Sequence, residues 1–503
     1  MAASRPFQII RGGLVLDVAA REAAPADILL KGDEILQIGA PGMAAPEEAS
    51  VISAEDRLII PGLVNAHTHG HGSLSKGLGD KWSLELLLNA SPWTNGGFTL
   101  EDKRVAAQLN AAEMVLKGCT AAYDMYFEFP TATPEGIEAI GAGYQDLGVR
   151  VALAPMMADM TLFQAIPGLM EALPEPHRTR AAAMGAAPHT QHIAMCRQIM
   201  EAWAFDRAAV RPALGPTIPL HCTDDFLTAC RDLAEELDLR IQMHLGESKV
   251  QAVSAQERYG KSLTAHLDGL GLLSERFTGA HCVWLNDDDL RSMAANGATI
   301  AHNPGSNLRL GSGIAPARDM RAHGIAVGIG TDGSGSSDNQ NMFEAMRAAA
   351  HVSRITKPDP EDWLGTWEVL EMGTMGGARV LGMDRLIGQI APGYKADLVF
   401  LDLGNVNFLP LNNAGNQIVN CEDSSAVASV MIGGKMVLSE RTFTGFDYAA
   451  LRGKVADAAA RIRETNVKLR GQMEAMAGYV SHHCVGLVCQ THDVKRRLDE
   501  GMG

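Results

Sequence analysis

Residues 58–69 read Leu58-Ile59-Ile60-Pro61-Gly62-Leu63-Val64-Asn65-Ala66-His67-Thr68-His69, an apolar run that ends in two histidines. Side chains i and i+2 of a strand point to the same face of the sheet. A strand with this ending therefore presents two imidazoles together, and zinc accepts imidazole nitrogens at about 2.0–2.1 Å. The stretch predicts a β-strand that carries two metal ligands at its C-terminal end.

Further potential ligands stand at the ends of later apolar stretches. His244, His281 and Asp332 each follow a short β-prone run, and Glu247 stands three residues after His244. Repeated placement at strand C-termini is typical of a parallel α/β barrel, because the active site of such a barrel is built at that rim. The chain is therefore expected to be of the α/β class, with a (β/α)8 TIM-like barrel.

The middle of the chain alternates strand-like and helix-like stretches, which is the pattern of βα units. The eight barrel strands are expected to end near His69, Asp124, Met157, Thr217, His244, His281, His302 and Asp332. Helices are predicted at 101–117, 224–238 and 340–350 from their apolar spacing. Residues 158–200 are long for a βα connection, so they are expected to form a lid or insertion over the site, or a surface excursion without catalytic contact.

Both ends of the chain show short apolar runs separated by turn residues, the pattern of a β-meander. Such runs occur within residues 6–60 and return at 388–401 and 426–437. Together they predict one small, discontinuous β-sandwich domain beside the barrel. The predicted segments are 1–60 and 385–446 for the sandwich, 61–384 for the barrel, and 447–503 for a C-terminal helix and tail.

Composition limits the class of protein. The chain has 503 residues, 46% of them hydrophobic and 20% charged, so it can bury a large core. A formal net charge of −16 argues against a nucleic-acid partner, which would need clustered Lys and Arg. The N-terminal residues 1–8 lack the apolar core of a signal peptide, and no stretch reaches the ~18–20 apolar residues of a membrane span. The protein is expected to be soluble and cytoplasmic, without a membrane partner, and its eight scattered cysteines suggest reduced thiols.

Five ordered motifs resemble those of the amidohydrolase superfamily, and more narrowly its branch of triazine hydrolases, guanine-type deaminases and adenosyl-homocysteine deaminases. The resemblance covers roughly residues 5–440. The motifs are Pro61-Gly62-Leu63-Val64-Asn65-Ala66-His67-Thr68-His69, His244-Leu245-Gly246-Glu247, His281, the stretch 301–313 with Asn303-Pro304-Gly305-Ser306-Asn307, and Gly328-Ile329-Gly330-Thr331-Asp332-Gly333.

The resemblance implies a catalytic metal site with one position open for water. Its ligands would be His67, His69, His244 and Asp332. Metal ligation lowers the pKa of a bound water toward ~7 and generates hydroxide at neutral pH. The resemblance further implies that Glu247 moves protons, that His281 stabilises the hydroxide or the adduct, and that Asp332 also belongs to the catalytic group. One zinc ion per chain is expected, with iron as an alternative, because residues 210–220 lack the lysine that binuclear members carboxylate.

Several other residues are assigned by their neighbourhood. His71 is expected to lie outside the coordination sphere, and His302 to position the loop that follows it. Trp82, Trp93 and Ser336 are candidates for lining the substrate pocket, although plain packing is the alternative for the tryptophans.

Two further features depart from the resemblance or lie at its edge. Lys76 stands where the branch often has arginine, and the two side chains are not equivalent for planar recognition. Residues 450–475 predict an amphipathic helix that docks on the barrel or on a second subunit. The tail after it holds His482, His483, Cys484, Cys489 and His492, which form a second metal site, a loosely packed tail or an oligomer contact.

The leading functional hypothesis is a mononuclear zinc-dependent hydrolase that cleaves C–N bonds, most simply an aminohydrolase (deaminase) of a nitrogen heterocycle. The alternatives are an amide, urea or carbamate hydrolase on an aryl substrate, and a triazine-type hydrolase that displaces a ring substituent. The expected partner is a small-molecule substrate, and a homodimer or larger homo-oligomer is expected.

Overall fold

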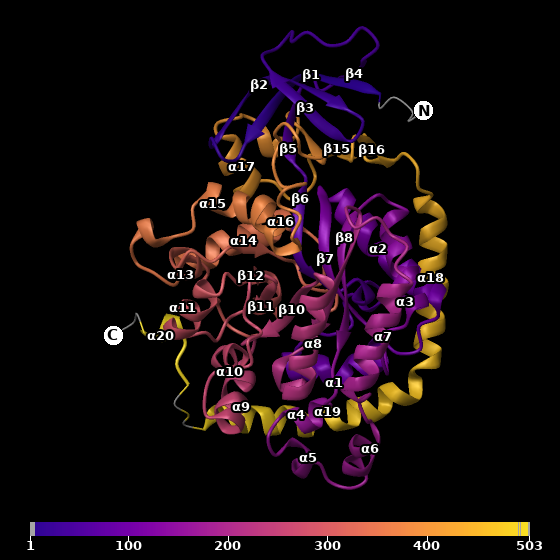
Figure 1. Cartoon of the computed structure of the whole chain (residues 1–503), viewed down its shortest axis with the longest axis vertical. Helices are drawn as coiled ribbons and strands as arrows, with labels where there is room; N and C mark the ends of the chain where they lie inside the picture. The colour runs from indigo at the N-terminus through magenta and orange to yellow at the C-terminus, as the bar shows by residue number, and fades with distance from the viewer. Residues whose placement is uncertain (1–5, 491, 493, 501–503) are drawn as a thin grey trace.

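The computed structural model describes residues 6–490, 492 and 494–500 and shows three parts. A β-sheet domain lies at one end of a central barrel, and a helical C-terminal arm, residues 448–489, runs along the side and the other end of the barrel (Figure 1). The outermost residues of the two predicted end segments, 1–5 and 501–503, lie outside the described residues.

The barrel consists of eight parallel strands in the described part of the chain, paired in sequence order. They are β6 (Leu63–Thr68), β7 (Cys119–Phe127), β8 (Arg150–Met157), β9 (Val210–Pro216), β10 (Arg240–Leu245), β11 (Phe277–His281), β12 (Thr299–His302) and β13 (Val327–Ile329). The segment just after the last strand is joined to the first strand where the backbone amide of Asp332 donates to the carbonyl of His67 at 2.9 Å. The predicted α/β barrel is confirmed.

The strand ends differ from prediction at two places. The eighth strand ends at Ile329, three residues before Asp332, and Asp332 itself has a φ of +62°, which a strand cannot accommodate. The second strand runs past Asp124 to Phe127, where it continues to pair with β8.

The predicted helices are present with small shifts of their ends. They are α2 (Leu100–Leu116), α8 (Asp224–Leu237) and α14 (Met342–Arg354). Side-chain caps define their beginnings: Thr223 accepts the amide hydrogen of Phe226 at α8, and Asn341 accepts two amide hydrogens at α14. The other helices around the barrel are α3 (Pro134–Gln145), α9 (Lys249–Tyr259), α10 (Leu263–Gly269), α11 (Asp287–Ala295), α12 (Pro304–Arg309), α13 (Ala317–Ala322), α15 (Thr366–Glu371), α16 (Gly377–Leu381) and α17 (Ala414–Asn420).

The excursion after β8 is helical. It contains α4 (Leu162–Ala165), α5 (Leu169–Ala172), α6 (His177–Ala183) and α7 (His189–Glu201). Phe163 and Leu169 are buried in one apolar cluster with Trp93 of α1 (Leu84–Thr94) and Met476 of the C-terminal arm. The excursion is therefore packed against segments that are distant in sequence.

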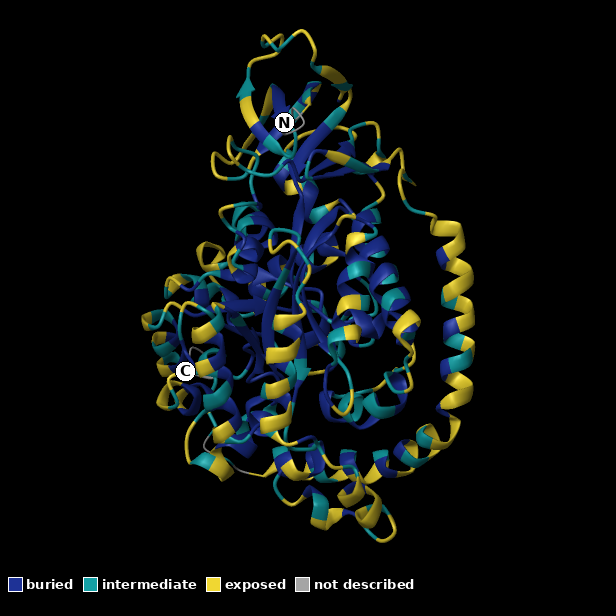
Figure 2. Ribbon diagram, turned by 45° about the vertical axis from the view of Figure 1, so that its right-hand side comes forward, coloured by how far each residue is buried: buried dark blue, intermediate teal, exposed yellow. Residues whose placement is uncertain are grey.

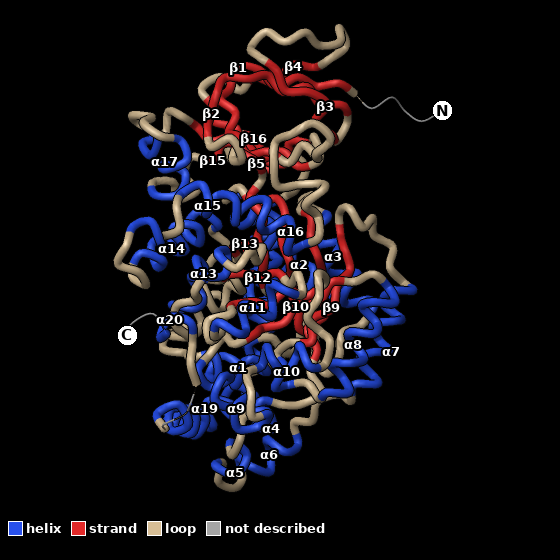
Figure 3. Tube along the Cα trace, turned by 60° about the vertical axis from the view of Figure 1, so that its left-hand side comes forward, coloured by secondary structure: helices blue, strands red, loops and turns tan. Residues whose placement is uncertain are grey.

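The β-sheet domain is built from two segments of the chain, one before and one after the barrel strands. Its strands are β1 (Phe7–Asp17), β2 (Glu22–Lys31), β3 (Glu34–Gly39), β4 (Ser50–Ser53), β5 (Arg57–Pro61), β14 (Leu398–Asp402), β15 (Val427–Ile432), β16 (Lys435–Ser439) and β17 (Thr442–Phe443). The antiparallel pairing of Ile60 with Val399 joins the two halves. The sheet curls so that its halves face each other (Figure 3), with Ile10, Phe400 and Met431 buried in one cluster.

The C-terminal arm extends the predicted helix into two. Helix α18 (Tyr448–Thr465) and helix α19 (Val467–Cys489) meet at Asn466. The side-chain amide of Asn466 donates to the carbonyls of Trp93 and Gly96 at 2.9 and 2.8 Å. The arm descends beside the barrel and then crosses below it, and its outer side is largely exposed (Figure 2). A short α20 (Arg497–Glu500) follows. None of the helices in the described part of the chain has the length and apolar character of a membrane span.

Candidate metal centre

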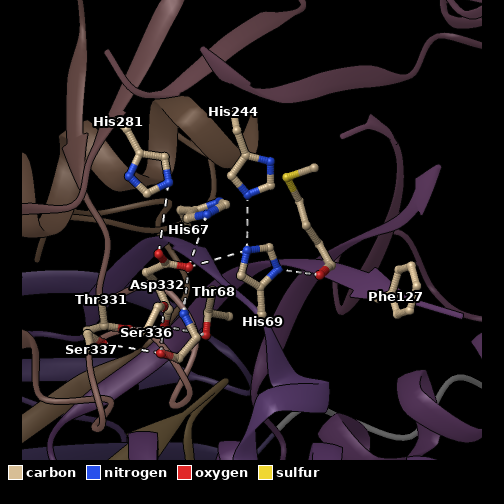
Figure 4. Close-up of polar contacts among 12 residues, drawn as sticks. His67, Thr68, His69, Phe127, His244, His281, Thr331, Asp332, Ser336 and Ser337 are labelled. Carbon is tan, nitrogen blue, oxygen red and sulfur yellow. Dashed lines mark hydrogen bonds and ion pairs between the residues drawn. The ribbon is translucent and has the colours of Figure 1, made fainter. Parts of the chain in front are cut away.

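Four imidazoles and one carboxylate converge at the C-terminal rim of the barrel (Figure 4). The Oδ1 atom of Asp332 lies 3.4 Å from Nε2 of His67 and 3.3 Å from Nε2 of His69. The Nε2 atoms of His69 and His244 are 3.1 Å apart. The structure thus brings together the four residues expected to bind the metal, from β6, β10 and the turn after β13.

The second ring nitrogen of each imidazole fixes its tautomer. Nδ1 of His69 lies 2.7 Å from the carbonyl oxygen of Met125, and Nδ1 of His244 lies 2.8 Å from that of Thr217. A carbonyl can only accept, so both Nδ1 atoms carry hydrogen and both Nε2 atoms present lone pairs. Such outer partners orient histidines that bind metals.

Gln242 performs the same task for His67. Its Nε2 donates to the carbonyl of Ala66 at 3.0 Å, so its Oε1 accepts from Nδ1 of His67 at 2.7 Å. Both side chains are fully buried. Sequence reasoning missed Gln242, although its position two residues before His244 on the same strand places both side chains on one face.

The donor set fits a borderline-soft divalent ion such as zinc. Two lone pairs facing each other at 3.1 Å repel unless a cation lies between them, and tetrahedral zinc–nitrogen bonds of ~2.0–2.1 Å would separate two ligand nitrogens by roughly 3.3 Å. Nε2 of His67 is buried without a hydrogen-bond partner in the described structure. Burial also lowers the pKa of His69 to about 4, which keeps its ring neutral and able to bind a metal.

Asp332 is ionised and held in an unusual conformation. Burial alone would raise the pKa of its carboxyl, but the surrounding imidazoles of His67, His69 and His281 hold that pKa well below its usual value. Its φ of +62° is rare for a residue with a side chain, and such strain clusters at functional sites.

A buried glutamine secures this strained turn. Gln340 accepts from the hydroxyl of Thr68 at 2.9 Å and donates to the carbonyl of Asp332 at 2.9 Å. It also accepts from Thr331, whose hydroxyl accepts from Asn65 at 2.7 Å. Sequence reasoning missed Gln340, because nothing in its local pattern indicates a contact with the first strand.

Glu247 and His281 form a second buried pair beside these ligands. Oε2 of Glu247 lies 3.7 Å from Nε2 of His281 and has no hydrogen-bond partner in the described structure. Burial, together with the charges of Asp332 and Glu85, raises the pKa of Glu247 well above its usual value. Burial lowers the pKa of His281 to about 3, and its Nδ1 contacts Oδ1 of Asn307 at 2.9 Å. A carboxyl with a raised pKa can carry a proton near neutral pH.

The pocket in front of the rim is lined by Glu247, His244 and two of the residues proposed for substrate contact, Trp82 and Ser336. Its volume, including the open mouth, is about 740 Å³, which lies within the ~300–1,000 Å³ of small-molecule sites. Trp93 is not among the lining residues, since it packs edge-to-face against Trp82 in the apolar cluster under the arm.

Three neighbouring residues have other surroundings. His71 lines the pocket outside the ligand groups, and its Nδ1 accepts the amide hydrogen of Phe127 at 3.2 Å. The ring nitrogens of His302 are buried without a hydrogen-bond partner in the described structure, so no hydrogen bond links its ring to the loop after it. Lys76 forms an ion pair with Glu113.

The C-terminal histidines and cysteines do not form a loosely packed tail. His482, His483, Cys484 and Cys489 lie along α19, and Nε2 of His483 contacts the carbonyl of Pro167 at 2.8 Å. Among the described residues, the groups able to hold a metal all belong to the barrel rim. Cys484 is buried and His483 is half-buried, so these two side chains pack α19, whereas His482 and Cys489 are exposed.

Comparisons with known proteins agree with this site. The chain matches the family model described as the Amidohydrolase family over residues 58–437. It is 34% identical to a 5-methylthioadenosine/S-adenosylhomocysteine deaminase of Nitratidesulfovibrio vulgaris over 82% of this chain and 87% of that protein. It is 29% identical to a 5'-deoxyadenosine deaminase of Methanobrevibacter smithii over 91% and 98% of the two chains.

Among solved structures, an adenosine deaminase from Xanthomonas campestris with bound zinc is similar with a TM-score of 0.81 and 27% identity, over 92% of this chain and 100% of that chain. Atrazine chlorohydrolase from Arthrobacter aurescens TC1, complexed with zinc, has a TM-score of 0.80 and 25% identity over 90% and 99%. The chain therefore belongs to the amidohydrolase family and is a metal-dependent hydrolase that acts on carbon–nitrogen bonds.

Proposed function

We propose that this hydrolase releases ammonia from an amino-substituted nitrogen heterocycle, with adenosine-type nucleosides as the first substrate class to test. The observation that carries the proposal is Glu247, a buried carboxyl with an unpartnered oxygen, next to His281 and the rim ligands. The relatives named as deaminases of adenosine derivatives support it.

The metal is proposed to be one zinc ion per chain, held by His67, His69, His244 and Asp332. When bound there, zinc would lower the pKa of a water toward ~7 and polarise the carbon that the water attacks. A single ion is supported by the convergence of the donors on one point. It is also supported by β9, which ends at Pro216 and is followed by Thr217 rather than a lysine.

Glu247 is proposed to move the protons. It would take one from the attacking water and give it to the ring nitrogen beside the attacked carbon, while the oxygen bonds to that carbon. A second proton, passed by the same route, would let the amino group leave as ammonia and the carbon–oxygen double bond form. His281 would accept a hydrogen bond from the attacking water through Nε2 and orient that water, because the hydrogen on its Nδ1 is held by Oδ1 of Asn307 at 2.9 Å; this Nε2 lies 3.7 Å from Glu247.

The test is ammonia release from adenosine derivatives, other purines, pterins and pyrimidines, with amides and phenylureas followed by product mass. Glu247→Gln should keep its zinc and lose about 10²–10⁴-fold in kcat, the usual contribution of an acid/base group. Glu257→Gln, on the exposed side of α9, is the control and should behave as wild type. Near-normal kcat for Glu247→Gln would overturn the assignment, and cleavage of amides or ureas without ammonia from any heterocycle would favour the amidase alternative.

A second candidate is displacement of another group from an azine ring, supported by the likeness to the zinc-bound atrazine chlorohydrolase. Both reactions begin with water attack on a ring carbon, so chloride release from chlorinated triazines separates them. We also propose a homodimer or larger oligomer, because Val467, Tyr479 and Val485 of α19 are exposed. Light scattering of the purified protein tests this.

A further inference from the structure

A second chamber opens directly beside the pocket of the metal centre. Leu88, Ser91, Met156 and Thr217 line both cavities. Thr217 also supplies the carbonyl that holds Nδ1 of His244, so the chamber begins next to a proposed ligand. A substrate whose ring reaches the rim can therefore extend a substituent into this chamber.

The chamber wall is unusually rich in methionine. Its members include Met156, Met157, Met160, Met184, Met473 and Phe163. They come from β8, from the excursion 158–200 and from α19; in Figure 1 the helices α4, α5, α6 and α19 lie together below the barrel. The side-chain amide of Asn89 donates to the backbone carbonyl of Met473 at 3.0 Å and fixes α19 against α1.

The wall offers no net charge to a ligand. Among the described residues that line the chamber, Glu128 is the one charged side chain. It forms an ion pair with Lys103 and accepts the amide hydrogen of Thr133 at 3.1 Å. The two lining histidines are neutral, because burial lowers the pKa of His192 and lowers that of His221 to about 4.

One guanidinium touches the wall without lining the chamber. Arg258 donates to the carbonyl of Leu220 at 3.0 Å, and its Nη2 lies 3.2 Å from the sulfur of Met160. Recognition of a carboxylate would normally use a bidentate arginine. Arg258 is instead engaged with a backbone carbonyl.

We propose that this methionine-lined chamber binds an uncharged, apolar substituent of the substrate, such as the thioether arm of a 5'-alkylthio adenosine, and selects against a zwitterionic amino-acid arm of similar length. This inference rests on the proposed deaminase function. Thioether sulfur and methyl groups pack well against methionine and aromatic side chains. A desolvated carboxylate or ammonium without a partner is strongly disfavoured.

The chemistry of the arm can be varied while the ring stays the same. We compare kcat/KM of the zinc-loaded enzyme for adenosine, 5'-methylthioadenosine, 5'-butylthioadenosine and S-adenosylhomocysteine. Each additional buried methylene should raise kcat/KM about fourfold. S-adenosylhomocysteine should fall at least tenfold below the butylthio compound. Equal or better use of S-adenosylhomocysteine would overturn the proposal, whereas absence of ammonia from all four would instead contradict the proposed function.

Charge placed in the wall gives a second, independent arm of the test. Met184→Arg should reduce the ratio of kcat/KM for 5'-butylthioadenosine to kcat/KM for S-adenosylhomocysteine about tenfold or more. Met160→Arg should have the same effect if the first variant does not fold. Met436→Arg is the matched control, since Met436 is a half-buried methionine in β16 of the other domain. A wild-type preference for S-adenosylhomocysteine that disappears in Arg258→Gln would refute the proposal and assign carboxylate binding to Arg258.

Discussion

The orientation of His67 by Gln242 gives a prediction that separates metal binding from folding. Replacing Gln242 by Met keeps the length of the side chain and removes both polar atoms. The Nδ1 hydrogen of His67, which now contacts Oε1 at 2.7 Å in a fully buried position, would have no acceptor. The carbonyl of Ala66 would lose the donor that now lies at 3.0 Å.

The magnitude follows from these two contacts. A buried polar group left without its partner costs about 1–3 kcal/mol. Loss of an outer partner of a metal-binding histidine typically weakens the metal about 10–100-fold, which corresponds to about 1.4–2.8 kcal/mol. Gln242→Met should therefore weaken zinc binding by that factor, and excess zinc should restore much of the lost activity.

Competition with a chromophoric zinc chelator measures this affinity directly, and circular dichroism checks that the variant is folded. Gln108→Met is the control, because Gln108 is a buried glutamine of α2 outside the metal centre. Its side chain donates to Asp146 at a distance of 2.6 Å. A folded Gln242→Met protein with wild-type zinc affinity would show that the contact does not orient His67 for the metal.

Three other outcomes follow from the same structure. His244→Ala should lose both zinc and activity, and elemental analysis of wild type should give about one metal per chain. Burial lowers the pKa of His302 to about 4. As pH falls from 6.5 to 4, this histidine therefore gains its proton in the unfolded chain before it does in the folded protein, and the free energy of unfolding falls by about 1.4 kcal/mol per pH unit. Denaturant titrations of His302→Leu should show a flatter dependence of this free energy on pH. Asp397→Ala removes the partner of buried Arg150, whose Nε lies 2.7 Å away, and should cost about 3–5 kcal/mol of unfolding free energy in urea titrations, whereas Glu236→Ala at an exposed ion pair should cost less than about 1 kcal/mol.

The sequence predicts the barrel and the positions of the proposed ligands because those features are local. A strand that ends in His67 and His69 places both imidazoles on one face by its own geometry. His244 and His281 follow the same rule, since parallel strands of a barrel end at one rim. The helices α2, α8 and α14 were equally visible in their spacing, and their ends differ from prediction by only a few residues.

The rest depends on contacts between distant segments, which a local pattern does not contain. Asp332 reaches the ligands through a left-handed turn that is fastened by Gln340 and the first strand. The histidines near residue 482 were ambiguous because a metal site and a packed helix use the same residue types. Their actual surroundings depend on Pro167 in the excursion, which is 316 positions away from His483.

The two halves of the active site differ in how they are built, and this difference has a consequence for specificity. The proposed ligands stand at strand ends and are fixed by hydrogen bonds of 2.7–2.8 Å, so a small displacement there would disturb the metal. The methionine-lined chamber is closed by the excursion and by α19, whose flexible thioethers can adapt to different apolar shapes. Substitutions in the chamber should therefore change which substituent is accepted while the zinc affinity stays constant. Loss of zinc from Met184→Arg or Met160→Arg would show that the two halves are coupled through Met156 and Thr217, the residues that they share.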